Sequence, residues 1–304
     1  MRRPGGILIL GATGLVGRHL VREFHPLGEI IGTSFKHVSK GLISIDIANG
    51  ETLRDLYHEI DPWLVLLPAA IADVDYCERN PERSWVVNVQ PPVILAELCA
   101  RSGAKLVFFS TDYVFSGDSG PYSESDRVAP VNIYGKHKLA AEQAILDRHP
   151  SALIIRTSLV YGERLYPPDP IARLVANVLR GERQGFPADQ WSSPTDVGDL
   201  CSGVRLLVGR SESGIFHLAG PVRCSRLDYA RAICKIFGGN PELIFSQARH
   251  PGSAPRPHSC GLRIEKAQKI INYRARHYLA GLAELHGRSC PATDLVRQPN
   301  VLNN

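Results

Sequence analysis

The chain has 304 residues, 44% hydrophobic and 21% charged, which is the composition of an ordinary soluble protein with room for one large domain or two. Its net charge of +5 is modest, and no stripe of lysine and arginine indicates nucleic-acid binding. The longest apolar run, at 63–72, is too short to span a bilayer, and seven scattered cysteines fit reduced thiols, so we expect a cytoplasmic protein with no membrane span, disulfide or metal site.

A glycine-rich turn lies between the first predicted strand and the first predicted helix. Residues 6–10 are a short apolar run, and GATGLVG follows at 11–17. Strand, glycine turn and helix in this order are typical of a dinucleotide-binding unit. Gly11 permits the tight turn, Gly14 lets the backbone approach a pyrophosphate, and Gly17 lets the helix pack closely on the strand. The N-terminus of the helix then offers N–H groups to the phosphates.

The second predicted strand, at 29–35, ends without a carboxylate. An acidic residue there would bind the 2′-hydroxyl of the adenosine ribose and repel a 2′-phosphate. The sequence instead continues from Ser34 and Phe35 to Lys36 and His37. We therefore predict NADPH as the preferred cofactor, with NADH as the alternative.

Short apolar strands alternate with helical patterns as far as residue 162. Further strands are predicted at 42–47, 63–70, 105–110 and 152–162, and helices at 50–60, 80–103 and from the Tyr134 region to about His149. The two prolines at 91–92 predict a kink or break in the second of these helices. This alternation predicts an α/β fold of the Rossmann type, a doubly wound parallel sheet.

The regular alternation ends after Tyr161, and the second half is predicted to form a smaller C-terminal substrate lobe that covers the ligand. Helices are predicted at 171–181, from about 195 to 209, and at 225–239, 263–271 and 274–287, with one strand at 214–220. The expected domains are 1–160 for dinucleotide binding, with 194–221 returning to it, 161–193 and 222–290 for the substrate lobe, and 291–304 for a flexible tail.

Tyr134 and Lys138 stand four residues apart in a predicted helix, so they share one face. Ser110 and Thr111 end the preceding strand, at the edge of a parallel sheet where ligands bind. A phenol beside an ammonium is a good proton donor, because the positive charge lowers the phenol pKa. A hydroxyl, a phenol and a lysine at this edge predict proton transfer to a carbonyl oxygen.

Eight motifs carry a resemblance that covers roughly residues 6–270. They are GATGLVG (11–17), AAIADVDYCERNP (69–81), VN (87–88), STDYVFSG (110–117), NIYGKHKLAAE (132–142), RTSLVYG (156–162), DQWSSPTDVGDL (189–200) and RPHSCGL (256–262). With them the chain resembles the extended short-chain dehydrogenase/reductases, most closely the dTDP-4-dehydrorhamnose reductase branch. The resemblance implies NADP(H)-dependent reduction of a keto group on a sugar or sugar nucleotide, with Thr111, Tyr134 and Lys138 as the catalytic trio.

The residue patterns and the resemblance together predict which residues meet each ligand. The cofactor would lie against Gly11, Thr13, Gly14, Leu15, Val16, Gly17, Lys36, Asp46, Ile47, Ala69, Ala70, Ile71, Phe109, Tyr134 and Lys138. The substrate would meet Thr111, Asp112, Tyr113, Leu159 and Arg256, with Arg256, Arg164 and Arg249 as candidates for a substrate pyrophosphate. The expected partner is a small-molecule ketone or sugar nucleotide, with a homodimer as a further possibility.

The substrate half departs from the usual pattern of the family. Leu67-Pro68 replaces Asn-Ala before Ala69, Leu159 replaces a tryptophan that faces the sugar, and Arg263 replaces an aspartate. These departures favour a keto substrate other than dTDP-4-dehydrorhamnose. Two alternatives stay open. One is an enzyme that acts on a nucleotide sugar with retained nicotinamide. Because no glutamate follows Asp112, as a dehydratase would require, this alternative is an epimerase. The other is a non-catalytic NADP-binding subunit resembling the regulatory β subunit of methionine adenosyltransferase.

Overall fold

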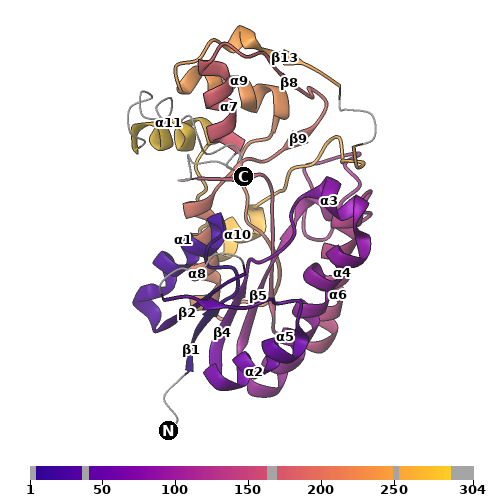
Figure 1. Cartoon of the computed structure of the whole chain (residues 1–304), viewed down its shortest axis with the longest axis vertical. Coiled ribbons are helices and arrows are strands. Elements are labelled where there is room, and N and C mark those ends of the chain that lie inside the picture. Colours follow the sequence, from indigo (N-terminus) through magenta and orange to yellow (C-terminus); the bar gives the residue numbers. More distant parts are fainter. Residues whose placement is uncertain (1–4, 36–40, 163–169, 249–252, 289–304) are drawn as a thin grey trace.

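A seven-stranded parallel sheet forms the centre of the molecule. The computed structural model describes residues 5–35, 41–162, 170–248 and 253–288 (Figure 1). The strands run in the order β11-β6-β5-β4-β1-β2-β3, and every neighbouring pair is parallel. Their bounds are β1 (Gly5–Ile9), β2 (Ile30–Ser34), β3 (Ile43–Ser44), β4 (Pro62–Leu67), β5 (Lys105–Thr111), β6 (Leu153–Thr157) and β11 (Gly214–His217). The strand order reverses between β1 and β4, as in dinucleotide-binding folds, and confirms the predicted Rossmann-type α/β class.

Helices cover both faces of this sheet (Figure 1). One face carries α1 (Leu15–Phe24), α8 (Val197–Gly209) and α10 (Glu265–Ile271), and the other carries α2 (Gly50–Ile60), α4 (Pro81–Asn88), α5 (Gln90–Ser102) and α6 (Ile133–Arg148). Ile7 and Ile9 face the first layer while Leu8 and Leu10 face the second, which explains the continuous apolar run. Within the described ranges, no helix is both long and apolar enough to cross a membrane.

The second half builds a separate small core above the carboxyl ends of the strands (Figure 1). It contains α7 (Pro170–Leu179), α9 (Arg226–Ile236), α11 (Tyr278–Arg288) and the short strands β8 (Gln184–Phe186), β9 (Trp191–Ser192), β12 (Cys224–Ser225) and β13 (Ile244–Ser246). These strands pair as β8 with β13 and β9 with β12. They were not predicted, because two or three residues are too few to show a period. We call this part of the structure the lobe.

The predicted strand at 152–162 is wrong in its second part. The strand β6 ends at Thr157, and the chain then leaves the sheet to form β7 (Val160–Tyr161), which pairs with β10 (Thr195–Asp196). Leu159 at the break has a φ of 40°, a left-handed conformation that side chains rarely adopt. The Ser158 hydroxyl donates to the Asp112 carboxylate at 2.6 Å, and the Ser158 carbonyl accepts from the Thr195 hydroxyl at 2.6 Å. These contacts, made with distant segments, draw the chain out of the sheet.

Two other predicted elements differ from the structure. The strand predicted at 42–47 is paired only at Ile43–Ser44, because the Asp46 carboxylate accepts from the Ala48 amide and starts a turn into α2. The segment before residue 80 contains an unpredicted short helix, α3 (Val74–Arg79), whose first turn is capped by the Asp73 side chain. The predicted break at the prolines is confirmed, since it separates α4 from α5.

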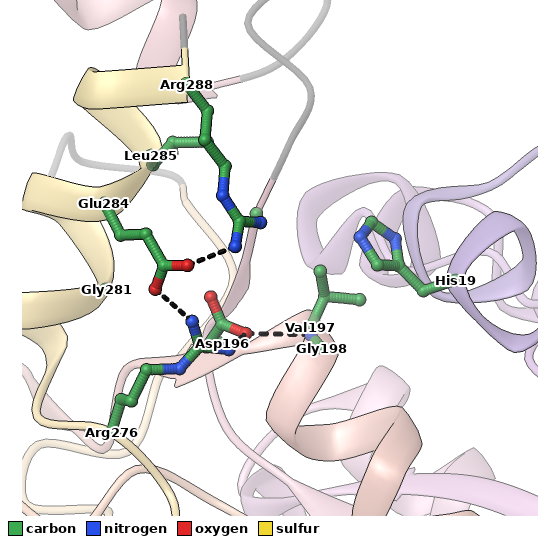
Figure 2. Close-up of a pocket in the computed structure, with 10 residues that line it drawn as sticks. His19, Asp196, Val197, Gly198, Arg276, Gly281, Glu284, Leu285 and Arg288 are labelled. Carbon is green, nitrogen blue, oxygen red and sulfur yellow. Dashed lines mark hydrogen bonds and ion pairs between the residues drawn. The ribbon is translucent and has the colours of Figure 1, made fainter. Parts of the chain in front are cut away.

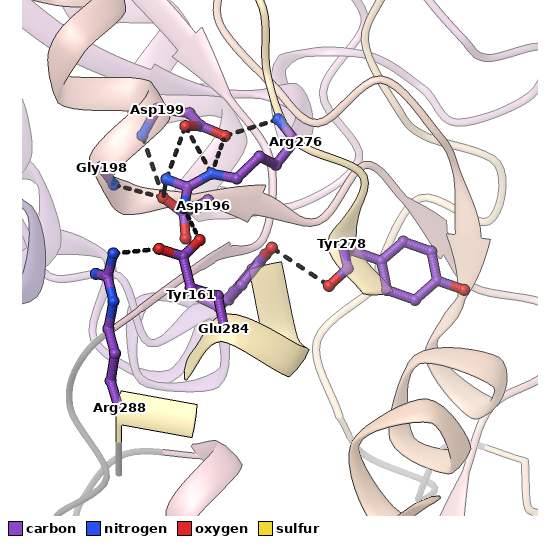
Figure 3. A network of polar contacts seen from close by, with 8 residues as sticks. All are labelled: Tyr161, Asp196, Gly198, Asp199, Arg276, Tyr278, Glu284 and Arg288. Carbon is purple, nitrogen blue, oxygen red and sulfur yellow. Dashed lines mark hydrogen bonds and ion pairs between the residues drawn. The ribbon is translucent and has the colours of Figure 1, made fainter. Parts of the chain in front are cut away.

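A charged network joins the lobe to the sheet (Figure 3). The Arg276 guanidinium contacts the carboxylates of Asp196 at 2.8 Å, of Asp199 at 2.8 Å and of Glu284. Asp196 also caps α8, so the network fixes α11 to the first turn of α8. Because α8 packs on α1 while α11 packs in the lobe core, this network sets the position of the lobe relative to the dinucleotide-binding half.

Candidate active site

The helix that carries Tyr134 is docked directly on the residues that follow β5. Asn132 caps α6 by accepting from the Gly135 amide at 2.8 Å. A Cβ atom at Gly135 would lie 2.2 Å from the Tyr113 carbonyl oxygen, so only glycine permits this approach. The first turn of α6 is thereby held against the short helix η2 (Asp112–Val114), next to the end of β5.

The three residues of the predicted trio lie together at the carboxyl end of β5. The Thr111 side chain lies close enough to the Tyr134 phenol to influence its pKa, and the Lys138 ammonium donates to the Phe109 carbonyl oxygen at 2.8 Å. Lys138 is only 3% exposed, and its Nζ lies 4.5 Å from the centre of the Phe108 ring. The structure thus brings a hydroxyl, a phenol and an ammonium to one edge of the sheet, as the sequence predicted.

The electrostatics of Tyr134 differ from the prediction. Burial raises the Tyr134 pKa, the Asp112 carboxylate raises it further, and the hydrogen bond from Thr111 opposes them. The net shift of this pKa is therefore upward, opposite to the expected lowering, and in this conformation the Lys138 ammonium donates to a backbone carbonyl. Burial lowers the Lys138 pKa to about 8, while Glu142 opposes that shift. Tyr134 is therefore protonated at neutral pH, whereas Lys138 loses its charge only above that range.

Asp112 is a buried carboxylate behind this group. It is 2% exposed and accepts hydrogen bonds from Ser158 at 2.6 Å and from Thr111 at 3.4 Å. Burial raises its pKa to about 6, against the effect of these hydrogen bonds. Its contact with Thr111 orients that hydroxyl. The neighbouring Tyr113 is partly exposed, with its ring 6.1 Å from that of Tyr134.

The glycine turn has the shape that a pyrophosphate requires. Gly11 has a φ of 91°, and a Cβ atom at Gly17 would lie 2.0 Å from the Gly11 carbonyl oxygen. A Cβ atom at Gly14 would instead meet no protein atom closer than 3.5 Å, so the backbone there is open. The helix α1 starts with no side-chain cap and no acidic residue, so its first N–H groups, at Leu15 and Val16, face this space without a competing carboxylate.

A second segment runs beside the glycine turn. The Ala69 amide donates to the Leu10 carbonyl at 3.1 Å, and Ala69 is also the nearest neighbour of Gly11. The side chain of Asn88 clamps Ile71 from both sides, accepting from its amide at 2.8 Å and donating to its carbonyl at 2.9 Å. The motif at 87–88 marked Asn88, but its spacing alone did not indicate this role. Of the predicted cofactor residues, Ala69 therefore lies beside the turn, while Asn88 fixes the backbone of Ile71 two residues farther along.

The remaining predicted ligand residues lie in different settings. Lys36, Arg164 and Arg249 lie outside the described residues. Asp46 is partly exposed at the end of β3, 3.4 Å from the Arg83 guanidinium, and Ile47 follows it. Arg256, predicted to meet a substrate phosphate, forms a two-pronged ion pair with Asp75 at 2.6 and 2.9 Å. This pair ties the loop before Cys260 to α3, so Arg256 has an internal counter-ion that the sequence did not indicate.

Gln190 is a site residue that sequence reasoning missed. Its side-chain amide donates to the Tyr113 hydroxyl at 3.0 Å, and it is 8% exposed. Gln190 belongs to the motif at 189–200, but the motif alone does not indicate its contact with Tyr113. That contact forms only when the lobe packs against the end of β5. Gln190 therefore marks the point where the lobe meets the predicted trio.

A small cavity lies away from the trio, beside the charged network (Figure 2). It measures about 70 Å³ and lies between His19 of α1, the first turn of α8 and Glu284 of α11. None of its lining residues belongs to the trio or to the glycine turn. Within the described part of the chain, no group of three His, Cys, Asp or Glu side chains is placed to hold a metal ion.

The family described as RmlD substrate binding domain matches residues 5–289. The chain belongs to this family. The RmlD-type chain is 38% identical over 259 residues to the dTDP-4-dehydrorhamnose reductase of Mycolicibacterium smegmatis, covering 83% of this chain and 76% of that protein. It is 30% identical over 239 residues to methionine adenosyltransferase 2 subunit beta of Rattus norvegicus, covering 76% of this chain and 72% of that protein.

A solved structure shares the fold of this RmlD-type chain. It is dTDP-4-dehydrorhamnose reductase of Bacillus anthracis in complex with NADP, with a TM-score of 0.83 and 27% identity over 95% of this chain and all of that one. The family and the Rossmann-type fold are thus established, and the chain is similar both to a reductase and to a methionine adenosyltransferase subunit.

Proposed function

We propose that this RmlD-type protein is an NADP(H)-dependent reductase that transfers a hydride to a keto group of a sugar or sugar nucleotide. The observation that carries the proposal is the meeting of Thr111, Tyr134 and Lys138 at the carboxyl end of β5, on the same sheet edge as the open glycine turn. A protein that only bound a dinucleotide would need the turn but not a phenol and a buried ammonium four residues apart on the helix that packs beside Thr111.

The cofactor is proposed to lie against Gly14, Leu15 and Val16 with its pyrophosphate, and against Ala69 and Ile71 farther along. When bound, NADPH supplies the hydride. The preference for NADPH rests on the tip of β2, where the described residues Ser34 and Phe35 offer no carboxylate to bind a 2′-hydroxyl.

Three side chains of the protein then act on the carbonyl oxygen. Thr111 donates a hydrogen bond that fixes the oxygen, and Tyr134 donates its proton as negative charge develops there. Lys138 stabilises the resulting tyrosinate through its positive charge. The high pKa of Tyr134 keeps the proton in place until the carbonyl oxygen becomes basic.

The proposal predicts a fall in reductase activity at alkaline pH. Burial depresses the Lys138 pKa from 10.5 to about 8, so the ammonium is fully charged well below pH 8 and is lost above it. Tyr134, whose pKa is raised, stays protonated across this range. We expect kcat/KM to be level below the Lys138 pKa and to fall about tenfold per pH unit above it. A profile that stays level up to pH 10 would contradict the role given to Lys138.

The direct test is NADPH oxidation against a panel of 4-keto nucleotide sugars and simple ketones, repeated with NADH. The proposal predicts turnover of at least one keto sugar, with NADPH used more efficiently than NADH. Equal efficiency with both cofactors would count against the assignment of NADPH.

The second candidate is a partner-binding subunit without its own chemistry. It is favoured by the similarity to methionine adenosyltransferase 2 subunit beta and by the altered substrate positions Pro68 and Leu159. Stoichiometric capture of a synthetase by this protein, together with no ketone reduction across the panel, would establish it instead.

A further inference from the structure

The first residue of α9, Arg226, is connected to Tyr134 through three successive contacts. Its backbone amide donates to the Gln190 carbonyl at 2.9 Å, and the Gln190 side chain donates to the Tyr113 hydroxyl at 3.0 Å. The Tyr113 ring is packed edge-on against that of Tyr134, with 6.1 Å between their centres. Arg226 is partly buried, and its backbone is thereby tied to the residues beside Tyr134.

The other arginines near this site already have partners. Arg256 is paired with Asp75, and Arg223 donates to the Gly120 carbonyl and to the Ser259 hydroxyl. Across the described residues, the Arg226 guanidinium forms no hydrogen bond or ion pair, and only its backbone amide is bonded. It is therefore the cation here whose charge is not neutralised within the described part of the chain.

The nearby carboxylates are also occupied. Asp228, two residues along α9, accepts from the Ser225 hydroxyl at 2.6 Å, and Asp189 is paired with His258 at 3.1 Å. Arg226 is also close enough to Tyr113 to influence the pKa of its phenol. Burial and then Asp112 raise the Tyr113 pKa to about 12, and Arg226 is the strongest influence in the opposite direction, ahead of Arg256.

We propose that Arg226 binds the diphosphate of a nucleotide-linked keto substrate and so holds the sugar over Tyr134. A planar guanidinium matches a phosphate with two parallel hydrogen bonds, and a partly buried cation gains most from a ligand that brings its own negative charge. This inference rests on the proposed reductase function and adds the residue that distinguishes a diphosphate-linked ketone from a free one. The proposed anion ligand is therefore Arg226 and not Arg256, the residue predicted from the sequence.

The test uses thymidine 5′-diphosphate as the probe, with binding measured by calorimetry on the full chain. Loss of charge-assisted hydrogen bonds is worth roughly 10- to 100-fold in affinity, so Arg226→Gln is expected to weaken binding by that factor. Arg226→Lys keeps a positive charge but loses the planar guanidinium that can make two parallel hydrogen bonds. Its affinity for the probe is expected to lie between those of wild type and Arg226→Gln. Lys235→Gln is the matched control, because it removes one positive charge from the exposed end of the same helix, about 14 Å away.

Equal affinities in wild type and Arg226→Gln would overturn the inference, as would a wild-type protein that does not bind the probe. In kinetics, Arg226→Gln should raise the KM for a diphosphate-linked ketone while leaving that for an uncharged ketone unchanged. Binding of the probe through Arg226 without reduction of any ketone would preserve the anion site and end the reductase proposal. Reduction that is equally efficient in wild type and Arg226→Gln for every ketone would preserve the reductase proposal and end the anion-site inference.

Discussion

Replacement of Tyr134 by phenylalanine is expected to lower kcat by about 10²- to 10⁴-fold, the usual contribution of a positioned proton donor. The phenol lies close enough to Thr111 for that side chain to influence its pKa, and burial keeps it protonated. Phenylalanine fills nearly the same volume, so the fold and the affinity for NADPH should be retained. Rates measured at saturating NADPH and ketone, with circular dichroism and a cofactor titration, test each part.

Tyr57→Phe is the matched control. Tyr57 is also a buried tyrosine, 2% exposed, and its hydroxyl contacts Ser102 at 2.5 Å on the helical layer of α2 and α5, outside the candidate site. This change should cost about 1 kcal/mol of stability through the lost hydrogen bond and leave kcat unchanged. If Tyr134→Phe turned over at the wild-type rate, the proton-donor role would have to be given up.

Two glycine substitutions in the turn at 11–17 are expected to separate cofactor binding from stability. Gly14→Ala should weaken NADPH binding, whereas Gly17→Ala should destabilise the fold. Gly14 has a φ of −69° and open space around it, so Gly14→Ala should leave the melting temperature unchanged. The new methyl group would stand where the pyrophosphate is proposed to lie, and an overlap of this kind, worth about 1–3 kcal/mol, weakens NADPH binding roughly 10- to 100-fold. Fluorescence titration with NADPH and thermal melts separate the two effects.

Gly17→Ala should instead destabilise the fold, because its Cβ atom would lie 2.0 Å from the Gly11 carbonyl oxygen and force α1 away from the turn. Gly209→Ala, in open space at the end of α8, serves as the control for adding a methyl group at a helical glycine. If Gly14→Ala bound NADPH as tightly as wild type, no pyrophosphate would lie against this turn.

The parts of the structure that local sequence patterns control were predicted well. The strand, glycine turn and helix at 6–24, and the spacing of Tyr134 and Lys138 on α6, are local features, and the structure contains each of them. The strand order follows from the alternation of strands and helices, which leaves few possible topologies.

The parts that depend on distant contacts were predicted poorly. The break after Thr157 depends on Ser158 meeting Asp112 and Thr195, which lie 46 and 37 residues away in the chain. The partner of Arg256 is Asp75, 181 residues away, and no local pattern indicates that pair. The pKa of Tyr134 depends on burial, which only the assembled layers determine.

The claim on which the whole account depends is that a ketone is reduced at Tyr134, and an isotope measurement tests it most directly. The protein would be incubated with a 4-keto nucleotide sugar and NADPH deuterated at the transferable position of the nicotinamide, and the product examined by mass spectrometry. The account predicts an alcohol that carries one deuterium on the former carbonyl carbon, formed by wild type and nearly abolished in Tyr134→Phe. An unlabelled product, or equal labelled product from both proteins, would contradict it.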